Sequence, residues 1–178
     1  PSRRSPRRQF WVIGLLLFQI QSQAAASITN DYSKSEVVIA VRDGVELYTE
    51  IYTPRHQKAD LPIIFLRTPY RVADTKGGFT RYFGSTFREL AKDRYIFAVQ
   101  DARGRHRSQG TFEWNRPIRH RADPQAVDAS TDAYDSIDWL TRNVKRNNGR
   151  VGMLGVSYPG WYVTMALIDP HPALRAAS

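Results

Sequence analysis

The chain contains no cysteine among its 178 residues. Disulfide frameworks, thiolate metal sites and a cysteine nucleophile are therefore excluded, whatever the compartment. The sequence also has no cluster of metal-ligating side chains and no glycine-rich phosphate loop, so it implies no metal and no organic cofactor. Any nucleophile in this chain must be an oxygen or an amine.

The length leaves room for little more than one domain, because domains average roughly 150 residues. Hydrophobic residues make up 42% of the chain and charged residues 24%, which provides enough apolar surface for a packed core. After the N-terminal segment there is no internal repeat and no low-complexity tract. The composition therefore predicts one globular unit.

The net charge of +9 would suit a nucleic-acid-binding protein, but its distribution argues against one. Four of the 26 basic residues lie within the first eight positions. From residue 27 onward, 22 basic residues stand against 17 acidic ones, a balance of +5. The arginines within 103–107 and 116–121 are interspersed with acidic residues, so we expect no nucleic-acid partner.

The first 26 residues have the order of a secretory signal peptide. Arginines precede an apolar stretch over residues 10–20, and three alanines at 24–26 follow a short polar segment. The stretch has 11 residues, whereas a membrane span needs roughly 20, so we expect no stable membrane anchor. Arg7 and Arg8 also fit a twin-arginine signal, which leaves the export route open. The sequence thus predicts a signal peptide over 1–26, one domain over 27–178 and a secreted or periplasmic location.

Three short apolar runs without polar alternation predict strands buried on both faces, as in a parallel sheet covered by helices. The runs span residues 61–66, 95–100 and 151–156. Apolar residues at helical spacing predict three helices, over 86–92, 128–144 and 161–168. Nearer the N-terminus, Asp43-Gly44 predicts a hairpin whose second strand, 45–52, has one face in water. The fold class is therefore α/β, a mostly parallel sheet with an antiparallel N-terminal hairpin.

The strongest chemical motif lies where the third apolar run gives way to a helix. Residues 155–160 read Gly-Val-Ser-Tyr-Pro-Gly, which places Ser157 in a tight turn between strand and helix. In a nucleophile elbow, such a turn exposes the serine hydroxyl and aims the next backbone N–H at a developing oxyanion. Pro159 stands where the simple G-x-S-x-G pattern has its last glycine, although proline is tolerated in a first helical turn. The pattern alone leaves open an incidental serine in a glycine-rich strand end.

Several motifs together resemble one group of α/β-hydrolases, which comprises cocaine esterase, α-amino-acid ester hydrolases and X-prolyl dipeptidyl peptidases. In chain order the matching segments are residues 67–70, 100–104, 108–110, 148–160 and 169–174. The family's elbow is G-x-S-Y-x-G, which accommodates Pro159. By this resemblance, 27–178 is the N-terminal part of an α/β-hydrolase catalytic domain, truncated after the nucleophile elbow.

The resemblance implies roles for three residues. Ser157 would be the nucleophile, while the Tyr158 backbone N–H and the Tyr70 hydroxyl would be the two oxyanion donors. The implied activity is that of an exported serine hydrolase, which cleaves esters or amides of small molecules through an acyl-serine, with α-amino-acid esters or acyl-peptides as candidate substrates. Without the resemblance, Tyr70 reads as a packing residue after a strand.

Other residues near these motifs have structural interpretations. Asp101 and Arg103 are expected to fix a turn or an ion pair. Trp161 and Tyr162 are expected to pack against the sheet, because one flank of the elbow helix must do so.

The resemblance also implies a triad in the order Ser, Asp, His along the chain. After Ser157 only Asp169 and His171 remain, and they are too close together to supply acid and base from separate strand ends. The earlier histidines are expected to be solvated surface residues: His56, His106 and His120. The triad partners are therefore expected beyond residue 178.

The missing partners lead to a prediction about the chain by itself. We expect it to be inactive and poorly stable, with the elbow strand as an unpaired apolar edge. A non-catalytic exported α/β module stays open as the alternative function, and so does homo-oligomerisation.

Overall fold

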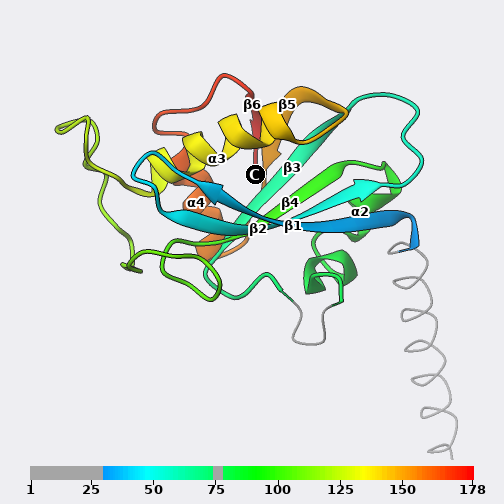
Figure 1. Cartoon of the computed structure of the whole chain (residues 1–178), viewed down its shortest axis with the longest axis horizontal. Coiled ribbons are helices and arrows are strands. Elements are labelled where there is room, and N and C mark those ends of the chain that lie inside the picture. Colours follow the sequence, from blue (N-terminus) through cyan, green and yellow to red (C-terminus); the bar gives the residue numbers. More distant parts are fainter. Residues whose placement is uncertain (1–29, 74–77) are drawn as a thin grey trace, which may run out of the picture.

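The computed structural model describes residues 30–73 and 78–178, which form a mixed sheet flanked by helices (Figure 1). The predicted signal peptide over 1–26 lies outside the described residues. Six strands are hydrogen-bonded in the order β1-β2-β4-β3-β5-β6. In chain order the elements are β1 (Tyr32–Ala40), β2 (Glu46–Pro54), β3 (Leu61–Thr68), η1 (Arg81–Gly84), α2 (Arg88–Lys92), β4 (Ile96–Asp101), α3 (Ala129–Asn143), β5 (Asn147–Met153), α4 (Tyr158–Ala166) and β6 (Leu174–Ala177).

The three apolar runs are neighbouring strands, as predicted. β3 pairs in parallel with both β4 and β5, and β1 and β2 form the antiparallel hairpin, closed by a hydrogen bond from the Val41 N–H to the Val45 carbonyl. The third run leaves the sheet earlier than expected, at Met153, because the chain then turns toward the elbow.

The prediction that the elbow strand is an unpaired edge is wrong. β6 pairs in parallel with β5 and occupies the edge of the sheet instead. The short segment 174–177 carries no strand signal of its own, because it is rich in alanine. Its strand conformation comes from pairing with β5, and hydrogen bonds join the two strands just past their ends: Gly155 donates to the Ser178 carbonyl at 2.9 Å.

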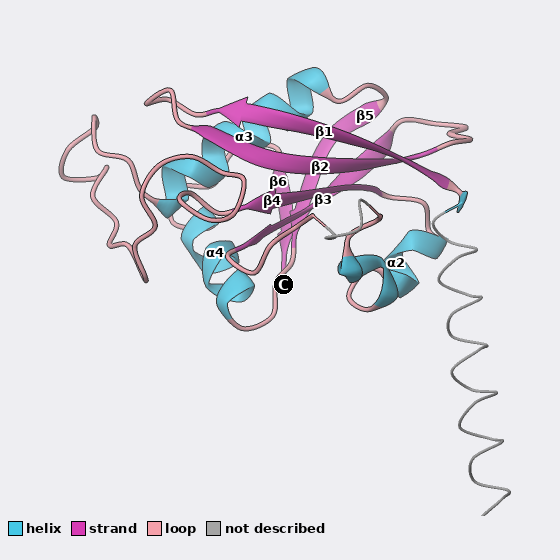
Figure 2. Ribbon diagram, turned by 60° about the horizontal axis from the view of Figure 1, so that its bottom comes forward, coloured by secondary structure: helices cyan, strands magenta, loops and turns pink. Residues whose placement is uncertain are grey.

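Helices cover both faces of the sheet (Figure 2). On one face, α3 and α4 pack against apolar side chains of all the central strands. On the other face, η1 and α2 close a second core that is dominated by aromatic rings. α3 begins where predicted, because the Asp128 carboxylate caps it by accepting the N–H groups of Ser130 and Thr131 at 3.0 and 3.2 Å. Within the described ranges, no helix is long and apolar enough to cross a membrane.

The expectation that one face of the second hairpin strand is in water is also wrong. Glu50 in the middle of β2 is fully buried, and Tyr48 and Tyr52 beside it pack in the aromatic core under η1 and α2. Both phenol hydroxyls donate to the Glu50 carboxylate, and Lys34 of β1 forms an ion pair with it at 3.1 Å. The face of β2 that carries Tyr48, Glu50 and Tyr52 is therefore buried, and its polar groups are hydrogen-bonded to one another. Alternation in the sequence cannot distinguish such a buried face from one in contact with water.

Candidate active site

Ser157 lies in a strained turn between β5 and α4. Its backbone has φ 62° and ψ −127°, outside the regions that L-residues normally adopt, and its side chain is exposed. Such a conformation persists only where the surroundings impose it, and it is common at functional sites. The geometry is that of a nucleophile elbow: a strand, a tight turn with the serine at its apex, and a helix that begins at the next residue.

Two glycines make this turn sterically feasible. A Cβ atom at Gly155 would lie 2.3 Å from the carbonyl carbon of Pro159, and one at Gly160 would lie 3.0 Å from the carbonyl oxygen of Gly155. The two glycines therefore face each other where the chain enters and leaves the turn. This explains why the second glycine lies three residues after Ser157, with Pro159 in the first turn of α4.

Tyr158 is the first residue of α4. The N–H groups of a first helical turn have no acceptor within the helix, so the Tyr158 N–H is available to a ligand beside Ser157. Its side chain extends to the long connection between β4 and α3, where the phenol oxygen accepts a hydrogen bond from the backbone N–H of Asn115 at 2.8 Å. The structure thus places the Tyr158 N–H directly after Ser157 at the start of α4 and attaches the Tyr158 side chain to this connection.

Tyr70 lies two residues past β3, the strand that pairs with β5. Because the two strands are parallel, Tyr70 and the elbow both lie beyond the carboxyl ends of the strands, on the same side of the sheet. Its side chain is 42% exposed, and its N–H donates to the Thr68 hydroxyl at 3.1 Å. The preceding carbonyl, of Pro69, accepts from Arg105 Nε at 3.1 Å and is 2.9 Å from His106 Nε2. The segment that carries Tyr70 is therefore fixed by the loop after β4.

Asp101 has the structural role expected of it. Its buried carboxylate accepts the backbone N–H groups of Val72 at 2.8 Å and Arg107 at 3.3 Å, and so fixes the segments after β3 and β4. Burial raises the pKa of Asp101 in spite of these donors.

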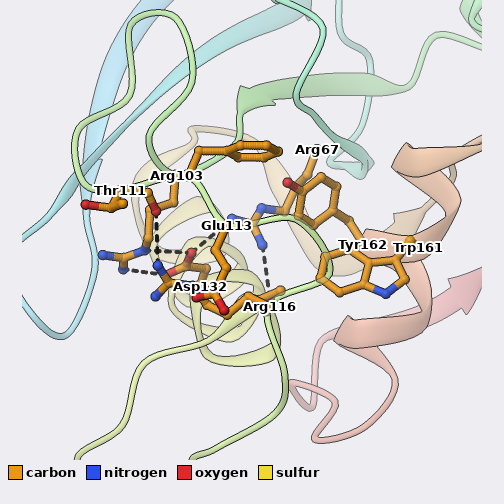
Figure 3. Close-up of a pocket in the computed structure, with 10 residues that line it drawn as sticks. Arg67, Arg103, Thr111, Glu113, Arg116, Asp132, Trp161 and Tyr162 are labelled. Carbon is orange, nitrogen blue, oxygen red and sulfur yellow. Dashed lines mark hydrogen bonds and ion pairs between the residues drawn. The ribbon is translucent and has the colours of Figure 1, made fainter.

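A buried network of charges lies between these segments and α3 (Figure 3). The Asp132 carboxylate of α3 forms ion pairs with Arg103 at 2.6 Å and with Arg67 at 3.4 Å. Arg103 also forms an ion pair with Asp43 of the hairpin at 2.7 Å. Burial opposes the charge of Arg103, yet hydrogen bonds with the two carboxylates raise its pKa overall. The expected ion pair of Arg103 is confirmed, and it joins the hairpin, the β4 loop and α3.

Arg67 is the buried residue that sequence reasoning missed. It is 1% exposed, and it donates to Gln100 of β4 and to the carbonyl of Ala129 in α3. Its guanidinium also lies 5.2 Å from the ring centre of Tyr162, which is buried as expected on the elbow helix. A cavity of about 20 Å³ remains between these groups, room for about one water molecule. The sequence does carry one sign that Arg67 is buried, because this arginine directly follows the apolar run 61–66.

Two of the three histidines that were expected to be exposed to solvent are exposed, and one is not. His56 and His106 are exposed, as predicted. The prediction for His120 is wrong: its side chain is only 10% exposed, with Nδ1 2.8 Å from Asp128 and Nε2 3.5 Å from Asp169. The side chain was read as solvated because its local segment is polar, but that segment folds back on the cap of α3.

The buried Asp128 carboxylate acts as an anchor for this connection. It accepts the backbone N–H groups of Arg119 at 2.9 Å and His120 at 3.1 Å, besides capping α3. Burial by itself would raise the pKa of Asp128, but these donors and the His120 ring lower it to about 2.

The sheet order, the antiparallel first hairpin and the serine elbow after β5 define the N-terminal part of an α/β-hydrolase fold. The model of the X-Pro dipeptidyl-peptidase (S15 family) matches residues 43–178, and the chain belongs to this family. The resemblance noted from the sequence motifs is therefore confirmed.

Three similar proteins illustrate the relationship. Cocaine esterase from Rhodococcus sp. (strain MB1 Bresler) is 32% identical over 150 residues, which cover 84% of this chain and 24% of that protein. A structure of a selenomethionine-labelled α-amino acid ester hydrolase is 41% identical with a TM-score of 0.72, and covers 84% of this chain and 25% of that one. An aminopeptidase from a marine sediment Thaumarchaeota archaeon is 38% identical with a TM-score of 0.73, over 83% of this chain and 25% of that one. The chain thus spans about a quarter of the length of these relatives.

Proposed function

We propose that the gene product containing this chain is an exported serine hydrolase that cleaves esters or amides through an acyl-serine intermediate. The observation that carries the proposal is the backbone of Ser157, which is strained at φ 62° between β5 and α4 in an exposed residue. Family membership and the ester- and peptide-cleaving relatives add support. The secreted or periplasmic location is proposed from the predicted signal peptide.

The proposed reaction begins with attack of Ser157 Oγ on the substrate carbonyl carbon. A C–O bond forms, the carbonyl electron pair moves to the oxygen, and the serine proton passes to a base. The Tyr158 N–H and the Tyr70 hydroxyl donate to the resulting oxyanion. Collapse of this intermediate expels the alcohol or amine, which takes up a proton, and leaves the acyl-serine for water to hydrolyse.

The base is proposed to lie beyond residue 178, where the family order places the Asp and His of the triad. Among the described residues, the ring nitrogens of His106, His120 and His171 contact groups other than Ser157. α-Amino-acid esters or acyl-peptides are the substrates proposed, because relatives that cleave amino-acid esters and peptides are among the most similar structures.

Steady-state kinetics of the complete gene product on aryl esters and aminoacyl esters test the proposal. Ser157→Ala should abolish turnover. Tyr70→Phe should keep KM and lose about 10²–10³ in kcat, the usual effect of removing one oxyanion donor. The matched control is Tyr134→Phe, on α3, which should behave as wild type. Full turnover in Ser157→Ala would refute the proposed nucleophile, and no turnover in wild type would favour the non-catalytic module. Wild-type kcat in Tyr70→Phe would remove only Tyr70 from the mechanism.

A further inference from the structure

The connection between β4 and α3, residues 102–128, lies along the elbow helix and contacts it near both ends. Near the start of α4, the Asn115 N–H donates to the Tyr158 hydroxyl at 2.8 Å. Past the end of α4, Arg121 donates to the Ile168 carbonyl at 2.5 Å, and His120 Nε2 lies 3.5 Å from Asp169. The connection is the long yellow-green loop beside α3 and α4 in Figure 1.

An aromatic contact reinforces the attachment at the start of the helix. The Trp114 indole meets the Tyr158 ring edge to face, with centroids 4.6 Å apart and planes at 90°. Tyr158 in turn packs against Trp161 and Tyr162 within α4, each at 5.3 Å. Trp114 is itself 60% exposed, so this indole is not placed there to fill the core. Besides Phe112 at 5.0 Å, it contacts Tyr158, the residue that follows the nucleophile.

The loop is in turn fixed to the rest of the fold. Arg119 and His120 donate their N–H groups to the buried Asp128 carboxylate at the cap of α3, and within the loop Arg116 donates to the Thr111 carbonyl at 3.0 Å. The segment that reaches Tyr158 is therefore braced on the cap of α3 and is not a free loop tip. A braced segment can restrain the residue that it contacts.

The elbow needs such a restraint. Ser157 has a backbone conformation that survives only when its neighbours impose it, and the N–H proposed as oxyanion donor belongs to Tyr158. Rotation of the first turn of α4 would move that N–H away from the developing charge. Misplacement by about 1 Å at a reacting centre costs on the order of 100-fold in rate.

From this geometry we propose that Trp114 and Asn115 are positioning residues, which hold the Tyr158 N–H toward the oxyanion by clamping the Tyr158 side chain. The inference rests on the proposed function. It assigns Tyr158 two separate tasks: its backbone contacts the substrate, and its phenol receives the loop.

The substitution Tyr158→Phe separates the two tasks, because it keeps the N–H and the ring and removes only the acceptor of the Asn115 hydrogen bond. In the complete gene product we expect kcat to fall about 10-fold or more with KM unchanged, because the lost restraint acts on the transition state. Trp114→Ala should likewise lower kcat and leave KM unchanged. Trp114→Phe should retain most of the wild-type kcat, because it keeps an aromatic ring against Tyr158.

Tyr32→Phe is the matched control. It also removes one tyrosine hydroxyl, bonded to the Ala91 and Tyr95 carbonyls on the opposite face of the sheet from α4. It should lower the melting temperature and leave kcat unchanged. A merely structural role for the loop contact would make Tyr158→Phe and Trp114→Ala behave like this control.

The outcomes separate this inference from the proposed function. If wild type forms a covalent adduct with a fluorophosphonate probe and Ser157→Ala does not, the nucleophile stands. Wild-type kcat in both Tyr158→Phe and Trp114→Ala would then overturn the positioning role alone. Turnover that survives in Ser157→Ala would overturn the proposed function, and the positioning role with it.

Discussion

Replacing Gly155 with alanine should damage the elbow more than any other glycine substitution near it. The new Cβ would lie 2.3 Å from the Pro159 carbonyl carbon and 2.4 Å from its oxygen. Carbon contacts are optimal near 3.5–4.0 Å, so the backbone of the turn must move by about 1 Å. Overpacking of this kind costs about 1–3 kcal/mol in stability, and the displacement should cost on the order of 100-fold in kcat.

Two further glycines give graded controls. A Cβ at Gly160 meets the Gly155 carbonyl oxygen at 3.0 Å, which needs a shift of only a few tenths of an ångström, while alanine in a helix gains about 1 kcal/mol over glycine. Gly160→Ala should therefore stay within about 1 kcal/mol of wild type and lose less than 10-fold in kcat. A Cβ at Gly152 meets the Ile64 methyl at 3.4 Å and the Ala176 Cβ at 3.8 Å, which are ordinary contacts, so Gly152→Ala should behave as wild type.

Urea unfolding and ester turnover of the complete gene product measure both effects in the same three variants. The reasoning requires the order Gly155→Ala, then Gly160→Ala, then Gly152→Ala, from most to least damaged, in both assays. A Gly155→Ala variant as stable and active as Gly152→Ala would show that the close approach within the turn does not constrain the nucleophile.

Two further predictions concern buried charges. Arg67→Met removes a buried cation that serves three acceptors, including the Asp132 carboxylate, and should cost about 3–5 kcal/mol in urea unfolding; a loss under about 1 kcal/mol would contradict this role. Asp128 has its pKa lowered from 3.8 to about 2 in the fold, so its contribution is fully present above about pH 4 and is lost as the pH falls toward 2, by about 2 kcal/mol at most. Unfolding midpoints between pH 2 and 6 should fall more steeply in wild type than in Asp128→Asn; equal slopes would refute the assignment.

The sequence predicted the parts of this fold that local pattern determines. Residues 61–66 and 95–100 are strands because continuous apolar runs suit a sheet covered on both faces. The elbow was found from its glycines and serine, since a sharp turn needs small residues at fixed spacing. α3 was predicted over 128–144 from apolar residues at helical spacing, and the structure shows that Asp128 caps its start.

The parts that were missed depend on contacts between distant segments. β6 exists because β5 offers it a partner, and its own residues carry little strand preference. Glu50 looked exposed because its strand alternates polar and apolar residues, and His120 because its local segment is polar. In the folded chain Lys34 pairs with Glu50 and Asp128 contacts His120. The contact of Asn115 with Tyr158 joins residues 43 positions apart, and no local sequence pattern predicts it.

The most direct test of the account is to locate the covalent adduct of a fluorophosphonate probe by peptide mass spectrometry of the complete gene product. The account predicts one modified residue, Ser157, with labelling abolished in Ser157→Ala and slowed in Gly155→Ala. An adduct on another serine, or no adduct while ester turnover proceeds, would contradict the assignment of Ser157 as the nucleophile.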